Sequence, residues 1–228
     1  MIHHWKAALA AAGIGFVCSV SSIAAGDDQT PLVKLLSDPT EQQHVISVAG
    51  RSTVILQNPC ATAQYTLEKK ISIYKQPLFD STGKLIDGAW KHVVDEEGCG
   101  VTRVLNVLVL AQGPNIVAVV PLLPGTTHAD AILQKDAVKF AVQAAATVSG
   151  GREANCQIGY VADTEFVERE STTLEGAKGP SWRELWTLVS CTHKLQIPVH
   201  FIPDSTGTSI SAGPNTAIKV IPLAGANQ

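Results

Sequence analysis

The chain repeats one ordered set of landmarks, and this repetition limits what it can fold into more than any other feature does. Trp90 and Trp182 are each followed by a basic residue, and each lies nine positions before a cysteine, Cys99 or Cys191. Another cysteine precedes each tryptophan, and the corresponding landmarks are offset by 92 to 96 residues. Self-similarity at a nearly constant offset is typical of repeated structural units. The sequence therefore predicts two diverged copies of one module.

In the first copy, a helix is predicted before a series of strands. Asp38-Pro39-Thr40-Glu41 supplies an N-cap residue, a proline for the first turn and a glutamate at the capping-box position. A shorter helical turn is expected after Thr30-Pro31. Tyr65 to Lys75 and Lys84 to Asp95 are rich in β-branched and aromatic residues, and they flank the turn sequence Asp80-Ser81-Thr82-Gly83. Two more strands are expected after the second cysteine of the copy.

The second copy shows the same order of signals. Its helix is predicted to start at Thr127, with Asp130 three residues on, and to stop at Gly150-Gly151. Cys156 to Glu168 and Trp182 to Ser190 are the corresponding strands. The predicted fold class is therefore α+β, with two tandem copies of a helix plus a mostly antiparallel four-stranded sheet, each closed by one disulfide.

The positions of the cysteines favour one disulfide within each copy. Four cysteines follow the first 25 residues, and an even number in an oxidising compartment indicates disulfides. The midpoint of Cys60 and Cys99 falls at the predicted turn near Asp80, and the midpoint of Cys156 and Cys191 falls in the second predicted hairpin loop. Residues equidistant from the turn face each other in an antiparallel hairpin. We therefore predict the two local pairings, while the other two connectivities stay open.

The first 25 residues have the layout of a secretory signal peptide. One basic residue precedes an apolar stretch and then small residues, where cleavage after Ala24 or after Ala25 fits equally well. An uncleaved membrane anchor is the alternative, although the apolar stretch is short for a span. We expect a periplasmic or secreted protein with no membrane span after signal removal. The predicted division is a signal peptide at 1–25, a first repeat at 26–125, a second repeat at 126–212 and a C-terminal tail at 213–228.

Composition and motifs exclude several classes of function. The formal net charge is −3, only 16% of residues are charged, and no strongly basic stretch occurs. Contact with a phosphate backbone would need such a stretch, so no nucleic-acid partner is expected. The chain has no Gly-x-Ser-x-Gly elbow, no Walker loop and no Gly-x-Gly-x-x-Gly sequence. No cofactor is predicted, and the cysteines are interpreted as structural.

Two patterns could carry chemistry. Asp80-Ser81-Thr82-Gly83 recurs as Asp204-Ser205-Thr206-Gly207, which suggests the paired carboxylates of an aspartic protease. However, an extra residue separates Asp from Gly, and Asp-Ser-Thr-Gly is also a good turn sequence, so turns are predicted. The histidines show no metal-ligand spacing, so no metal site is predicted, although zinc or copper bound by several of them is the alternative. The mature histidines are His44, His92, His128, His193 and His200.

The leading hypothesis is a non-enzymatic exported protein that binds a protein or an envelope component. The strands after Cys191 alternate between apolar and polar residues, so one sheet face of the second copy is expected to meet solvent. The predicted binding surface consists of Trp182, Glu184, Trp186, Gln196 and His200. The alternative is a periplasmic hydrolase whose site is assembled from several loops, with Asp80, His92, Asp204 and His200 as first candidates.

Overall fold

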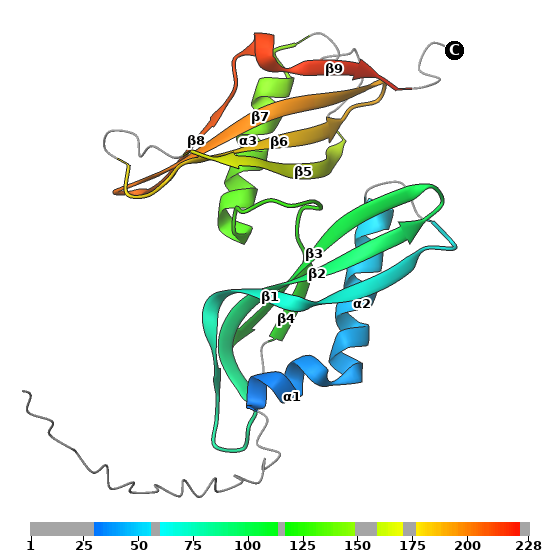
Figure 1. Ribbon diagram of the computed structural model, residues 1–228, viewed down its shortest axis with the longest axis vertical. Coiled ribbons are helices and arrows are strands. Elements are labelled where there is room, and N and C mark those ends of the chain that lie inside the picture. The colour runs from blue at the N-terminus through cyan, green and yellow to red at the C-terminus, as the bar shows by residue number, and fades with distance from the viewer. Residues whose placement is uncertain (1–29, 56–59, 114–116, 149–158, 171–176, 224–228) are drawn as a thin grey trace, which may run out of the picture.

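The computed structural model describes residues 30–55, 60–113, 117–148, 159–170 and 177–223, which form two units stacked along the long axis (Figure 1). The first unit contains helices α1 (Pro31–Ser37) and α2 (Pro39–Ile55) and strands β1 (Gln64–Phe79), β2 (Leu85–Gly98), β3 (Val101–Gln112) and β4 (Val117–Pro121). The second contains helix α3 (Ala131–Ala145), strands β5 (Tyr160–Arg169), β6 (Trp182–Val189), β7 (His193–Asp204) and β8 (Gly207–Ala212), the 3-10 turn η1 (Asn215–Ala217) and strand β9 (Lys219–Pro222).

Each unit has one antiparallel sheet. Sheet A has the order β1-β2-β3-β4, and sheet B has the order β5-β6-β7-β8 with β9 added against β7. The α+β class and the antiparallel sheets are confirmed, but sheet B has five strands where four were predicted. The additional strand lies within the residues assigned to a C-terminal tail, and its Val220 pairs with Leu195. The sequence of this strand, Lys-Val-Ile-Pro, does not alternate between apolar and polar residues, so it lacks the period-two pattern that identifies a strand.

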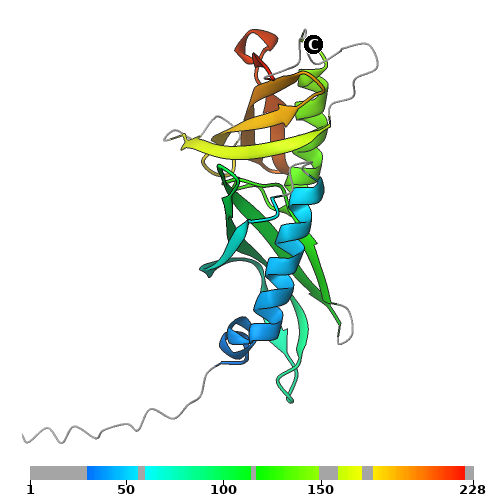
Figure 2. The ribbon, with the colours of Figure 1, turned by 90° about the vertical axis from the view of Figure 1, so that its right-hand side faces the viewer.

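One helix covers one face of each sheet, and Figure 2 shows α2 and α3 on the same side of the molecule. Val45, Val48 and Ala49 of α2 recur at helical spacing and join Trp90 and Val94 in the first core. In the second core, α3 presents Ala137, Ala141 and Ala145, four residues apart, to large residues of β6 and β7. These large residues are Trp186, Leu188, Leu195, Ile197 and Phe201. Small helix residues therefore let α3 lie close to a bulky sheet face.

The predicted start is correct for the long helix α2 and wrong for the long helix α3. α1 and the start of α2 are confirmed, and Asp38 accepts a hydrogen bond from the backbone N–H of Thr40 at 2.8 Å. The predicted start of α3 at Thr127 is wrong, because the helix begins at Ala131. Asp130 is its N-cap and accepts from the N–H groups of Ile132 and Leu133. Thr127 instead accepts from the N–H of Ala129 and shapes the preceding turn.

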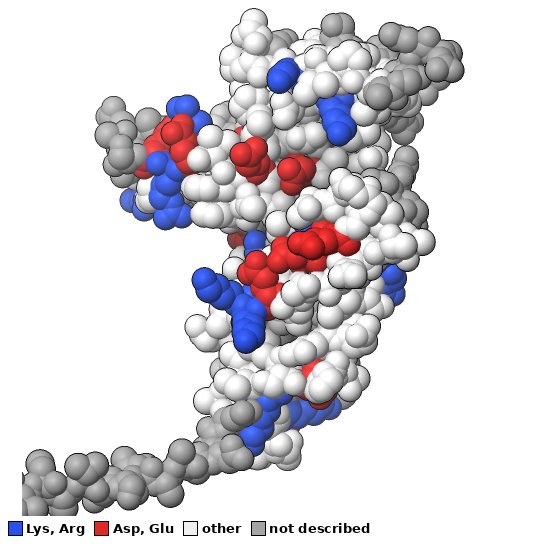
Figure 3. Space-filling view, turned by 45° about the vertical axis from the view of Figure 1, so that its right-hand side comes forward, with Lys and Arg blue, Asp and Glu red and all other residues white. Residues whose placement is uncertain are grey.

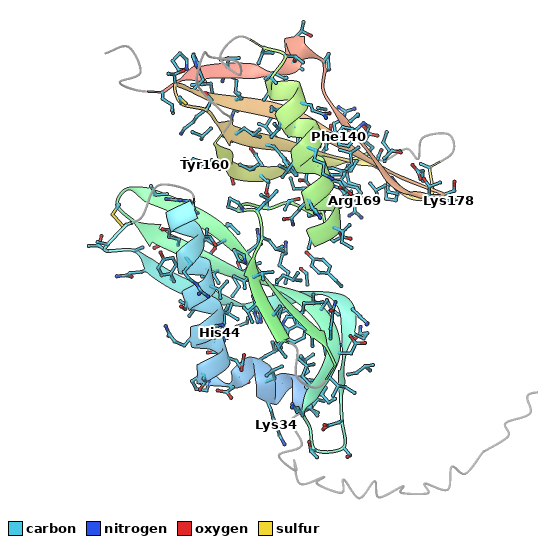
Figure 4. All side chains as sticks on the ribbon, turned by 180° about the vertical axis from the view of Figure 1, so that it is seen from behind. Lys34, His44, Phe140, Tyr160, Arg169 and Lys178 are labelled. Carbon is cyan, nitrogen blue, oxygen red and sulfur yellow. A yellow bond between two sulfur atoms is a disulfide. The ribbon has the colours of Figure 1, made fainter. Side chains whose placement is uncertain are left out.

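The predicted Cys60–Cys99 disulfide is confirmed, with a Cα–Cα distance of 6.0 Å. It joins the chain just beyond the end of the β1–β2 hairpin and is the yellow bond at one end of sheet A in Figure 4. A Cβ on the neighbouring Gly98, whose φ is +151°, would lie 3.1 Å from the Cys60 Sγ, so glycine is required there. Cys191 is also disulfide-bonded. Cys156 lies outside the described residues, so the Cys156–Cys191 pairing stays a prediction.

The segment between β4 and α3 holds the two units together. Asn106 of β3 donates to the carbonyls of Leu123 and Gly125, both at 2.8 Å, and so fixes the segment on sheet A. On the other side, Thr164 of β5 donates to the carbonyl of Pro124 at 2.6 Å. Gly125 is obligatory, because a Cβ there would lie 2.1 Å from the Thr164 carbonyl oxygen. The space-filling view in Figure 3 shows the surface hollowed between the two units.

Within the described residues, no helix combines the length and apolar character that a membrane crossing requires.

Candidate functional site

The five residues of the predicted binding surface lie on two opposite faces of sheet B. Trp182, Glu184 and Trp186 alternate along β6 on the face that α3 covers, and Trp186 and Glu184 are only 0% and 1% exposed. Gln196 and His200 are half-buried on the opposite face of β7. Side chains two apart in a strand share a face. The prediction of one surface is therefore corrected, because it combined even positions of β6 with the solvent-facing positions of β7.

Glu184 connects sheet B to the segment between the units. Its carboxylate accepts from the indole N–H groups of Trp182 at 2.9 Å and Trp186 at 2.8 Å, and from the backbone N–H of His128 at 2.8 Å. Lys91, from sheet A, also interacts with this carboxylate electrostatically: burial lowers the pKa of Lys91, and the charge of Glu184 opposes that shift. These donors supply the hydrogen bonds that a buried carboxylate needs to offset its lost hydration.

The outer face of sheet B carries an ion-pair cluster. Glu170 accepts a hydrogen bond from Ser181, pairs with Arg183 at 2.8 Å and lies 3.3 Å from the Nε2 of His200. The Ser181 hydrogen bond, followed by the charges of His200 and Arg183, lowers the pKa of Glu170. Gln196 lies elsewhere on this face and lines a cleft of about 710 Å³ between the two sheets. Glu170 and His200 are partly buried in this cluster, whereas Arg183 reaches solvent, and ion pairs with a solvent-exposed partner contribute little to stability.

Both Asp-Ser-Thr-Gly segments form turns, as predicted, and they lie in different units. The Oδ1 of Asp80 accepts from the N–H of Thr82 at 2.8 Å, and the Oδ1 of Asp204 accepts from the N–H of Thr206 at 2.7 Å. The Thr82 hydrogen bond lowers the pKa of Asp80, and hydrogen bonds from Ser209 and Thr206 lower the pKa of Asp204 to about 2. Two carboxylates that shared a proton would instead raise one of the two pKa values.

Changing both aspartates to asparagine, Asp80→Asn with Asp204→Asn, is expected to leave the melting temperature unchanged within error. An asparagine keeps the Oδ1 acceptor that closes each turn. Proteolysis of an unfolded protein substrate at acid pH provides the second measurement, since an amide cannot take up or share a catalytic proton. Wild-type cleavage that disappeared in a normally folded double variant would show that the carboxylates are catalytic.

The histidines that could have bound a metal have other contacts. Among the described residues, no group of three or more His, Cys, Asp or Glu side chains is placed to hold a metal ion. His128 stacks on Phe166 with the ring centroids 3.9 Å apart, His193 pairs with Thr192 at 2.7 Å, and His200 faces Glu170. Each contact accounts for its histidine without a bound ion.

A cavity of about 660 Å³, here called the helix–sheet pocket, lies between helices α1 and α2 and sheet A. Lys34 on α1 and His44 on α2, both labelled in Figure 4, mark its helical side. Charged groups of both signs, including Lys34 and Glu41, lie among its lining residues. The apolar walls include Leu35, Val45, Phe79, Trp90, Val109 and Val119. The sequence offered no signal for this pocket, because its walls come from two helices and four strands.

A hydrogen-bonded pair forms part of the pocket wall. The indole Nε1 of Trp90 donates to the Nε2 of His92 at 3.0 Å, and both residues line the cavity. His92 is 6% exposed, and its burial lowers the pKa of the imidazole, so the ring is neutral at pH 7. The Nδ1 of His92 has no hydrogen-bond partner among the described residues. The second unit uses the corresponding spacing differently, because there Trp182 donates to the carboxylate Glu184.

Comparison with models of known protein families found no match, and comparisons with curated proteins and with solved structures found none either.

Proposed function

We propose that this chain is an exported, non-enzymatic binding protein whose ligand occupies the helix–sheet pocket. One observation carries the proposal: the pocket measures about 660 Å³ and has largely aliphatic and aromatic walls. Cavities of roughly 300–1,000 Å³ with such walls and a few polar groups are the usual sites of small-molecule binding. The ligand class is therefore a small molecule with a mainly apolar body, rather than the protein or envelope partner expected from the sequence.

The contacts of the candidate catalytic residues favour binding over hydrolysis. Asp80 and Asp204 each accept hydrogen bonds within their own turns. His200 faces Glu170 on the outer face of sheet B, and His92 uses its Nε2 to accept from Trp90. A general base needs an accessible lone pair within reach of the proton that it removes. In His92 that lone pair is already engaged.

The disulfide and the amino-terminal segment both support the proposed compartment. Disulfides such as Cys60–Cys99 persist in oxidising compartments and are rare in the cytosol. The signal-like residues 1–25 point to the same side of the membrane. The proposed ligand is therefore one that is met in the periplasm or outside the cell.

Blocking the pocket mouth should abolish binding of an apolar probe. Val117 on β4 lines the pocket and is 50% exposed, so Val117→Trp should place an indole in the mouth without disturbing the core. We expect the mature protein to enhance the fluorescence of anilinonaphthalene sulfonate, and the variant to bind this probe at least about tenfold more weakly, a loss equivalent to about 1.4 kcal/mol. The measurement is a fluorescence titration.

The matched control is Val120→Trp. Val120 lies on the same strand, is 39% exposed and does not line the pocket. It should leave probe affinity unchanged, because side chains an odd number of residues apart in a strand point to opposite faces. Equal binding by both variants, or no fluorescence enhancement with the wild type, would contradict the proposed site.

A protein partner on the outer face of sheet B is the second candidate. Two observations favour it: that face is half-buried rather than covered by α3, and it borders the cleft of about 710 Å³ between the sheets. The cleft contains groups of both signs, namely Arg103, Asp163, Glu165 and Lys194. The same variants distinguish the two candidates, because a partner that binds this face should bind Val117→Trp and Val120→Trp as well as it binds the wild type.

A further inference from the structure

We propose that the cleft of about 710 Å³ between the two sheets, here called the intersheet cleft, binds an extended basic peptide segment as an added strand on the outer edge of β3. The segment belongs to a partner protein, and its lysine or arginine side chains face Asp163 and Glu165. This site is separate from the helix–sheet pocket, so the inference goes beyond a small-molecule ligand and gives the second candidate function a chemical identity.

The first residues of β3 have an outer edge that no strand covers within the described residues. Strand β4 pairs only with Val107–Ala111, and beyond it the N–H of Gly125 donates to the carbonyl of Val104 at 2.7 Å. That carbonyl therefore points away from β2. Backbone groups two residues apart in a strand point the same way, so the N–H and C=O of Thr102 also point outward. Thr102 is exposed and lines the intersheet cleft.

The segment between β4 and α3 already makes the kind of pairing that we propose for the peptide. Gly125 donates to Val104 of β3, and the next N–H, that of Thr126, donates to the carbonyl of Thr164 of β5 at 2.6 Å. These four residues all line the intersheet cleft. Along the cleft, β5 continues to Tyr160, which Figure 4 labels, above the end of sheet A that carries the disulfide. A peptide on the first residues of β3 extends this pairing along the cleft.

The regular geometry of β3 favours an extended peptide as the occupant. The pairing of β2 with β3 runs without a register shift, from Gly98 opposite Val101 to Asp87 opposite Gln112. The edge strands β1 and β5 are instead interrupted by register shifts, which disrupt a ladder and protect an edge from further pairing. A regular free edge offers backbone donors and acceptors that only another extended chain can match in sequence.

The side chains of β5 favour a basic segment. Asp163 and Glu165 are two residues apart, so they lie on the same face of β5, and both reach solvent and line the cleft. A Cβ on Gly125 would lie 2.5 Å from the Oδ1 of Asp163, so this carboxylate is beside the segment that pairs with β3. Partial loss of hydration raises the pKa of Asp163, and the charge of Glu165 adds to the rise. A cation placed there would stabilise both ionised carboxylates.

The basic residues that line the cleft do not cancel this charge. The Nε of Arg103 lies 3.4 Å from the Oε2 of Glu96, a buried carboxylate, so the arginine already balances a charge of its own unit. Lys194 is on β7, and the whole of strand β6 separates it from β5. The side of the cleft that adjoins the β5 carboxylates is therefore acidic.

A short labelled peptide and the mature protein test the inference by fluorescence anisotropy. The probe is fluorescein-labelled Val-Lys-Val-Lys-Val-Thr, whose β-branched residues favour the extended form. Two copies are methylated on alternate backbone nitrogens, one copy in each phase, so that edge donors are lost while the side chains stay. We expect at least one of these copies to bind at least about tenfold more weakly than the parent. A copy with glutamate in place of lysine should bind at least about fivefold more weakly.

Variants of the protein locate the binding. Thr102→Pro removes the outward N–H, and proline is tolerated where the N–H of a strand faces solvent, so the variant should fold and bind the peptide at least about tenfold more weakly. Thr102→Ala is the matched control, because it removes the side chain, keeps the N–H and should leave the affinity unchanged. Asp163→Asn with Glu165→Gln should weaken binding at least about fivefold. Glu168→Gln, on the same strand but outside the cleft, should not.

Amide exchange followed by NMR keeps the test independent of the folding of Thr102→Pro. The N–H of Thr102 should exchange freely in the mature protein alone and become protected at saturating peptide. Protection in the absence of peptide would show that the chain itself covers this edge and would overturn the inference. Absence of peptide binding, or equal binding of the parent, both methylated copies and the glutamate copy, would overturn it too. None of these results alters the titration of the helix–sheet pocket with anilinonaphthalene sulfonate, so the two proposals can fail separately.

Discussion

Replacing Glu184 with alanine is expected to lower the free energy of unfolding by about 3–5 kcal/mol, the usual cost of removing one partner from a buried charge network. Three N–H donors lose their acceptor together: the indoles of Trp182 and Trp186 and the backbone N–H of His128. Each buried donor left without a partner costs about 1–3 kcal/mol. Lys91 also loses the opposite charge that offsets its burial.

The measurement is urea unfolding followed by tryptophan fluorescence, with Glu165→Ala as the control. Glu165 is an exposed acidic residue on the adjacent strand β5, paired with Leu185, so its loss should cost less than about 0.5 kcal/mol. Glu184→Gln should fall between the two, because the amide keeps one acceptor oxygen but turns donors toward the indoles. A Glu184→Ala variant as stable as Glu165→Ala would show that the three hydrogen bonds contribute nothing to the joint between the units.

The spacing of Glu184 between two tryptophans is a signal of burial that the predicted binding surface did not use. Trp182, Glu184 and Trp186 occupy alternate positions, so a strand must place all three on one face. Two indole donors on either side of a carboxylate are a signal for a buried, fully paired acid rather than for an exposed surface. A charged side chain by itself favours a solvent-facing position, because charged side chains are rarely buried, so only the flanking indole donors indicate the burial of Glu184.

The features that could be predicted from the sequence were those set by residues close together in the chain or in one hairpin. Turns at Asp80 and Asp204 depend on side-chain contacts within a few residues, and the structure confirms both. The Cys60–Cys99 pairing followed from hairpin symmetry and is also confirmed. The start of α3 was predicted wrongly, because Thr127 and Asp130 both resemble N-caps. In the structure Asp130 accepts from the first-turn N–H groups, whereas Thr127 accepts from the N–H of Ala129.

The helix–sheet pocket and the short strand β9 depend on tertiary placement, so the sequence could not reveal them. The wall contains Leu35, Phe79, Trp90 and Val119, which are far apart in the chain and belong to different elements. No periodicity relates such residues, since their proximity arises only when α1 and α2 dock on sheet A. In the sequence Trp90 is a landmark of the repeat and His92 a candidate residue of the alternative hydrolase, and only the structure shows the hydrogen bond between them.

Removing the Cys60–Cys99 disulfide is expected to lower the free energy of unfolding by about 4 kcal/mol, the chain-entropy value for a closed loop of this size. The two cysteines are 39 residues apart, and the loop between them contains the whole β1–β2 hairpin. The test is urea unfolding of the double variant Cys60→Ala with Cys99→Ala, compared with the wild type. Trp90 on β2 provides the fluorescence signal from the first unit.

Thr62→Ala separates the crosslink from its local contacts. The Thr62 Oγ1 lies 3.5 Å from the Sγ of Cys60 and 3.6 Å from the Sγ of Cys99, at an exposed site, so this variant removes the contacts and keeps the bond. It should cost less than about 0.5 kcal/mol.

The folded double variant should still bind the apolar probe. The disulfide lies beyond one end of the β1–β2 hairpin, whereas Thr82 and Gly83, in the turn at the opposite end, line the pocket. If Thr62→Ala were as destabilised as the double variant, local packing rather than the covalent loop would account for the loss. If probe binding vanished while the core of the first unit remained folded, the pocket would depend on the end of sheet A that carries the disulfide. That result would contradict the expectation that the two are independent.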